Sequence, residues 1–171
     1  MLFAAVRYAI EKLEYKSTQL ILFARALGCG PATRIARTLC EHALPPMALI
    51  LQSPYTSILD LAAQHTEQDG NGVLRRALQN AWRTIDDIEA VTAPTLVLAG
   101  ARDTQIPPEH AKAVFKASGA KCRKISIAAK ATNSKFNKET DVLAPIHKFL
   151  SSLEQVRSPN KSINSSSKSN K

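Results

Sequence analysis

The sequence predicts an α/β protein built on a parallel sheet of about four strands. Four short apolar runs occur along the chain, and the first three are nearly continuous rather than alternating, which is typical of strands buried on both faces. Segments with helical apolar spacing lie between these runs, so strands and helices alternate. The length of 171 residues suits one domain, and 44% apolar residues are enough to bury a core.

The expected elements follow in order along the chain. An N-terminal helix is indicated by apolar residues at helical spacing: Leu2, Val6, Ile10 and Leu13. Strands are expected at 20–23, 48–51, 95–99 and 124–128. Helices are expected at 31–44, 73–82, 108–118 and 141–153. We expect a loop over 68–72 and a disordered Ser/Lys/Asn tail over 157–171, because that composition buries too little apolar surface to offset the entropy of ordering.

The formal charge of +9 comes from two segments, and the rest of the chain carries −3. The tail 157–171 has four basic residues and no acid. The region 111–138 has eight basic residues and no acid: Lys112, Lys116, Lys121, Arg123, Lys124, Lys130, Lys135 and Lys138. This region indicates a solvated surface or a weak contact with anionic membranes. Nucleic acid is not an expected partner, because Phe115 and Phe136 are too few aromatics for a stacking platform.

Cysteine usage and the N-terminal sequence indicate the cellular context. Cys29, Cys40 and Cys122 are widely spaced and form no CxxC pair, so we expect no disulfide framework, metal or cofactor. The first residues lack a signal-peptide pattern, because Arg7 interrupts the apolar run. No apolar run reaches the roughly 20 residues that a membrane-spanning helix needs. A cytoplasmic location is expected, with a membrane-peripheral one as the alternative.

The most informative stretch runs from Leu20 to Pro31 and reads LILFARALGCGP. An apolar strand leads into a Gly-rich turn and then directly into a helix. This arrangement resembles the nucleophile elbow of the α/β-hydrolases, G-x-S-x-G, in which small residues flank a serine on a strained turn. The resemblance implies a serine hydrolase fold.

Further fragments extend the resemblance over residues 20–150. QSPYTS, from Gln52, resembles the S-P-x-T-S segment of the acyl-protein (palmitoyl) thioesterase-like or serine aminopeptidase-like branch. APTLVLAGARD, ending at Asp103, is similar to the strand that carries the triad acid, and IPPEH continues it. The resemblance makes residues 1–156 a partial α/β-hydrolase domain. It contains an elbow region (20–31), a lid-like insertion (58–84) and an acid-strand region (94–103).

The resemblance also places the catalytic positions of the family, residue by residue. The nucleophile serine falls on Ala26, and the acid falls on Asp103, which is retained. The base histidine falls near Asn133, and the first oxyanion donor is the backbone N–H of Leu27. A methyl group cannot attack a carbonyl, and no imidazole stands opposite the acid. We therefore expect a hydrolase-like protein that has lost ester or thioester hydrolysis and acts by binding or assembly.

Other candidate nucleophiles and bases have weaker support. Cys29 lies about one helical turn beyond the elbow position, where burial against the sheet is favoured over a reactive thiol. Ser53 and Ser57 receive no role. Structural or surface roles are expected for all histidines: His42, His65, His110 and His147.

Compared with the family, the fold implied here is truncated and lacks the N-terminal strands. The segment from Leu20 to Phe23 would then be an open apolar edge, which natural proteins usually cover. A truncated gene model, a degenerate gene product and a partner chain that completes the sheet are the three explanations. Two other functions stay open: an active serine-hydrolase-type esterase or acyl-protein thioesterase, and a basic adaptor at anionic membranes.

Overall fold

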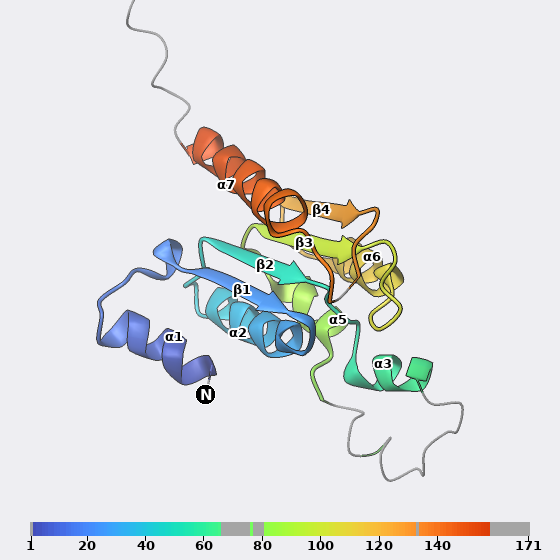
Figure 1. Ribbon diagram of the computed structural model, residues 1–171. Coiled ribbons are helices and arrows are strands. Elements are labelled where there is room, and N and C mark those ends of the chain that lie inside the picture. Colours follow the sequence, from blue (N-terminus) through green and yellow to red (C-terminus); the bar gives the residue numbers. More distant parts are fainter. Residues whose placement is uncertain (1, 66–75, 77–80, 133, 158–171) are drawn as a thin grey trace, which may run out of the picture.

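The computed structural model describes residues 2–65, 76, 81–132 and 134–157, and its centre is one parallel sheet (Figure 1). Four strands lie in the order β1-β2-β3-β4. Their bounds are β1 (Ile21–Arg25), β2 (Ala48–Gln52), β3 (Thr95–Gly100) and β4 (Arg123–Ala128). Every pair of neighbours is parallel, with Phe23 of β1 opposite Ile50 of β2. All four predicted strands are present, and the predicted α/β class is confirmed.

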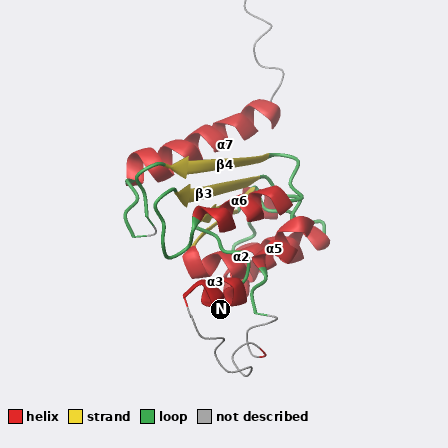
Figure 2. Ribbon diagram, turned by 90° about the vertical axis from the view of Figure 1, so that its right-hand side faces the viewer, coloured by secondary structure: helices red, strands yellow, loops and turns green. Residues whose placement is uncertain are grey.

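Helices cover both faces of the sheet (Figure 2). One face carries α2 (Cys29–Glu41), α5 (Thr84–Asp87) and α6 (Pro108–Ala117), and the other carries α7 (Ala144–Arg157). Two further helices are α1 (Leu2–Glu11), which packs against α2, and α3 (Ile58–His65), which follows β2. Two of the three continuous apolar runs therefore became the strands β2 and β3, which are buried on both faces.

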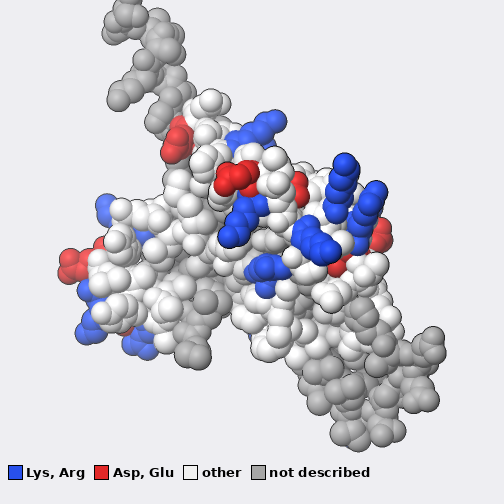
Figure 3. All heavy atoms as spheres, in the orientation of Figure 1, with Lys and Arg blue, Asp and Glu red and all other residues white. Residues whose placement is uncertain are grey.

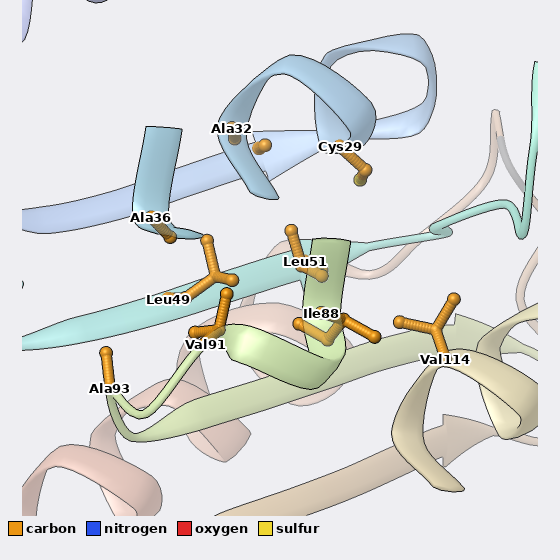
Figure 4. Close-up of a cluster of buried hydrophobic side chains, with 10 residues drawn as sticks. Cys29, Ala32, Ala36, Leu49, Leu51, Ile88, Val91, Ala93 and Val114 are labelled. Atoms are coloured by element: carbon orange, nitrogen blue, oxygen red, sulfur yellow. The ribbon is translucent and has the colours of Figure 1, made fainter. Parts of the chain in front are cut away.

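The two faces have separate cores. Leu49 and Leu51 of β2 point toward α2 and toward Ile88 and Val114, as Figure 4 shows. On the opposite face, Phe149 of α7 is fully buried among apolar residues of β2 and β3. All residues of β2 and β3 are buried, whereas β1 and β4 are partly exposed.

Several segments differ from their predicted form or lie outside the described residues. The predicted helix at 73–82 is mostly outside them, and Trp82 itself is not helical but has a positive φ of 41°. The last helix begins with a π-helical turn, Lys138–Leu143, before α7 starts at Ala144. The predicted loop 68–72 and residues 158–171 of the predicted tail also lie outside the described part.

A buried carboxylate joins α2 to α5. Asp87 is 1% exposed, and it accepts hydrogen bonds from Arg34 Nε at 2.7 Å and from Arg37 Nη1 at 3.1 Å. Both arginines lie on α2, one turn apart. Asp86, the preceding residue, is half exposed and pairs with Arg83.

Replacing Asp87 with asparagine is expected to lower the free energy of unfolding by about 2 kcal/mol, because two charge-assisted hydrogen bonds lose their buried partner. Asp86→Asn is the matched control, with an expected change within about 0.5 kcal/mol because exposed ion pairs contribute little. Urea unfolding followed by circular dichroism measures both variants. Equal losses in the two variants would contradict the role given to Asp87.

Candidate active site

The carboxyl ends of the strands carry the residues at which the family places its chemistry. Ala26 follows β1, Ser53 follows β2 and Asp103 follows β3 by three residues. The carboxyl ends of parallel strands meet at one edge of a sheet, which is where ligands bind in open α/β folds. Asn133, the approximate base position, follows β4 and lies outside the described residues.

Ala26 has the backbone geometry of an elbow without its nucleophile. Its φ is 48°, in the left-handed region that a residue with a Cβ adopts only at a cost. A 3-10 turn over Ala26–Gly28 leads directly into α2. Leu27, whose N–H is the expected oxyanion donor, has a 54% exposed side chain, and its carbonyl accepts a hydrogen bond from Tyr55 Oη at 3.2 Å.

Close packing behind the turn requires glycine at position 30. A Cβ on Gly30 would lie 2.6 Å from Trp82 Cβ and closer still to the Tyr55 hydroxyl. Those two residues come from separate segments, so the first turn of α2 contacts both. Trp82 therefore packs against the first turn of α2.

Asp103 is buried and binds its own loop. It is 4% exposed, and its Oδ1 accepts hydrogen bonds from the backbone N–H groups of Gln105 at 3.0 Å and Ile106 at 2.9 Å. Ser53 Oγ donates to Oδ2 at 3.4 Å. The carboxylate therefore stabilises the loop after β3. The sequence analysis assigns no role to Ser53, and the structure places its hydroxyl beside the Asp103 carboxylate.

The turn after β4 is fixed to the loop after β3. Arg102 N–H donates to the Ala131 carbonyl at 3.1 Å, and Ala101 N–H donates to Ala128 at 2.9 Å. A Cβ on Gly100 would collide with the Ala131 carbonyl oxygen, so glycine permits this approach. No histidine occurs between His110 and His147, so this turn brings no imidazole to Asp103.

Cys29 is not placed to act as a nucleophile. It is fully buried at the start of α2, and its thiol donates to the Gln52 carbonyl at 3.4 Å. Burial raises the pKa of the Cys29 thiol well above its usual range, and the hydrogen bond from the thiol to the Gln52 carbonyl is a smaller, opposing influence. The thiol is thus protonated at neutral pH, and the expectation of a structural cysteine agrees with this environment.

His110 is a buried titratable residue, although the sequence predicted only a structural or surface role for it. It is 5% exposed, and Thr56 N–H donates to its Nδ1 at 3.3 Å, while its Nε2 lies 3.1 Å from Gln64 Oε1. It thus joins α6 to the segment after β2 and to α3. Burial lowers the pKa of His110, and the carboxylates of Asp60 and Glu109 oppose that shift. His42 and His147 are exposed.

Two basic side chains of the region 111–138 contact other residues of the chain. Arg123 stacks over Phe115 with its guanidinium 5.6 Å from the ring centroid, and Lys124 Nζ donates to Ser152 Oγ at 3.0 Å. Figure 3 shows acidic side chains among the basic ones on the face it presents. Contact with anionic membranes stays a prediction.

The described parts of the chain contain neither a cluster of metal ligands nor a helix suited to span a membrane. There, no three residues among His, Cys, Asp and Glu come together in a way that could hold a metal ion. None of the helices in those ranges is long and apolar enough to cross a membrane.

Glycine at position 26 is expected to raise the free energy of unfolding by about 1 kcal/mol, because Ala26→Gly removes the strain of a left-handed alanine. Ala32→Gly, within α2, is the control and is expected to lower it by more than about 1 kcal/mol, because it loses a buried methyl group as well as helix propensity. Thermal and urea unfolding measure both changes. A free energy of unfolding that falls in Ala26→Gly, as it does in the control, would show that the backbone at Ala26 is not strained.

Stability is expected to fall as the pH drops from 7.5 to 5.5. The folded chain keeps His110 neutral below the usual imidazole value of 6.5, whereas the unfolded chain takes up the proton there. Above that value His110 is neutral in both states and its contribution is constant. His110→Gln is expected to flatten the pH dependence of the unfolding free energy, measured in urea. An unchanged slope in this variant would exclude His110 as its source.

Sequence comparison identifies relatives that are larger than this chain. No protein-family model matches it. The α/β-hydrolase domain-containing protein WAV2 of Arabidopsis thaliana is 27% identical over 128 residues, which are 69% of this chain and 41% of WAV2. The lysophosphatidylserine lipase ABHD12 of Danio rerio is 31% identical over 109 residues, covering 56% of this chain and 28% of that protein. The chain thus spans less than half of each relative.

Structural comparison covers most of the chain. The structure of Est1E from Butyrivibrio proteoclasticus aligns with a TM-score of 0.69 at 22% identity, over 91% of this chain and 68% of Est1E. The monoacylglycerol lipase of Paleococcus ferrophilus aligns with a TM-score of 0.56 at 17% identity, over 91% and 73% of the two chains. The assignment to the thioesterase-like branch stays a prediction.

Both comparisons point to the α/β-hydrolase superfamily, whose fold this chain carries in part.

Proposed function

We propose that this chain is a catalytically degenerate α/β-hydrolase-like protein that acts by binding or assembly. The observation that carries the proposal is Ala26, a methyl side chain on the left-handed turn where the family places its nucleophile. An elbow of this shape without a hydroxyl or thiol has no atom that can form a covalent acyl intermediate.

The surroundings of the turn support the same conclusion. The Asp103 carboxylate is engaged by backbone N–H groups of its own loop, and Cys29 is a buried, protonated thiol. Removing the triad leaves at most the effects of substrate binding and an oxyanion hole, roughly 10³–10⁴-fold over water in serine proteases.

Active-site labelling tests the proposal. A fluorophosphonate probe is expected to leave the chain unlabelled, and p-nitrophenyl esters and lysophosphatidylserine, the lipid in the name of the zebrafish relative, are expected to be hydrolysed at the buffer rate. Ala26→Ser is expected to stay within tenfold of this background, because no histidine follows β4 to activate the new hydroxyl.

The opposite outcome identifies an active enzyme. Stoichiometric labelling of the unchanged chain would overturn the proposal and favour an esterase or acyl-protein thioesterase. The variants Cys29→Ala and Asp103→Asn, each assayed after its folding is confirmed by circular dichroism, would then show which group is used.

A further inference from the structure

We infer that the outer edge of β1 is a docking site for one extended segment of a partner polypeptide, with an acidic side chain placed beside Lys138. The inference deepens the proposed binding role by naming the surface and the chemistry of the partner. It is carried by the backbone of β1, the contrast between the two sheet edges, and a groove beside β1.

The backbone of β1 presents hydrogen-bonding groups to its open side. The Leu20 carbonyl accepts from Met47 N–H at 2.8 Å, so Leu20 faces β2. Successive residues of a strand direct their backbone groups to opposite sides, so Ile21 and Phe23 direct theirs away from β2. The sheet of the described residues has no strand on that side, because β1 ends the order. An added strand would form hydrogen bonds with these free backbone groups.

The two edges of the sheet differ in a way that favours docking at β1. The β4 edge carries the exposed charges of Arg123 and Lys124, a common protection against pairing with other chains. The β1 strand instead exposes Ile21 (41%) and Phe23 (52%), and its only charge is at its last residue. Edge strands without such protection pair readily, so the composition of β1 favours a strand partner.

A groove of about 570 Å³ beside β1 indicates which side chains the partner carries. Its apolar lining comes from β1, the turn after β4 and the last helical region: Phe23, Phe136, Val142, Leu143 and Ile146. Lys138 adds a positive charge to the same lining, and no acidic residue is part of it. Apolar walls with a cation at their border fit an apolar side chain followed by a carboxylate.

The position of α1 favours a single strand over a second copy of this chain. In Figure 1, α1 lies on the open side of β1, and Val6 and Ile10 form a groove with Leu39 of α2. A second copy that paired through its own β1 would bring its α2 into the layer that α1 occupies. One extended segment requires no such space.

Amide hydrogen exchange with two synthetic peptides tests the site. Both peptides have the same alternating Val–Thr core; one ends in two glutamates and the other in two lysines. The acidic peptide is expected to slow exchange at Ile21 and Phe23 at least tenfold at saturation, and the basic peptide is expected to bind at least tenfold more weakly. Exchange at Leu22 and Ala24, which face β2, is expected to stay unchanged.

Matched variants separate the edge from general effects. Phe23→Lys is expected to abolish peptide-dependent slowing without loss of folding, because this side chain is half exposed. Ile127→Lys makes the same change on β4, where Ile127 is 38% exposed, and is expected to leave peptide binding intact. Lys138→Glu is expected to reduce the preference for the acidic peptide to less than threefold.

Three results would overturn the inference: no slowing by either peptide, equal slowing by both, or slowing at β4 instead of β1. Protection at Ile21 that rises with protein concentration, together with a dimer mass in light scattering, would assign the edge to a second copy and also overturn it. The labelling assay is independent, since an active enzyme would refute catalytic degeneracy while leaving peptide protection at Ile21 and Phe23 unaffected.

Discussion

Leu49 and Leu51 of β2 pack toward α2, while Ile50 between them packs toward Phe149 of α7, and all of these side chains are buried. Burial of the central strands on both faces is the constraint on which the remaining structure depends. It fixes the register of β2 and β3, because a shift by one residue would exchange the two faces. The outer strands β1 and β4 pair with β2 and β3, and both outer strands are less buried.

The elbow shows that a strained turn can serve the fold without serving catalysis. The left-handed turn at Ala26 allows the chain to leave β1 and enter α2 within a few residues. That path brings Gly30 against Tyr55 and Trp82, and it aligns α2 so that Arg34 can reach Asp87. The turn therefore has a structural role that is independent of a nucleophile. The same holds for Asp103, whose carboxylate binds the backbone of its own loop.

The sequence was sufficient to predict the strands, but it did not predict which distant segments contact one another. Short apolar runs predicted all four strands, and burial on both faces, which removes the need for alternation, holds for β2 and β3. Helical spacing predicted a helix that includes Trp82, whereas Trp82 has a positive φ and packs against Gly30 of α2. His110 and Ser53 were given no specific site role, since their neighbours Gln64 and Asp103 are 46 and 50 residues away. A histidine just after a proline-initiated helix start gives no signal of burial.

The exposed edge follows from the same constraint as the core. An apolar strand at the end of a sheet is prone to pair with other chains, and natural proteins usually cover or charge such an edge. In β1, Leu22 and Ala24 pack against the α2 side, whereas Phe23 lies beyond the cover of α7. A Lys at position 23 would have protected the edge, as the basic residues of β4 do. The apolar composition of β1 is therefore the composition of an inner strand, and it favours a neighbour on the open side of the sheet.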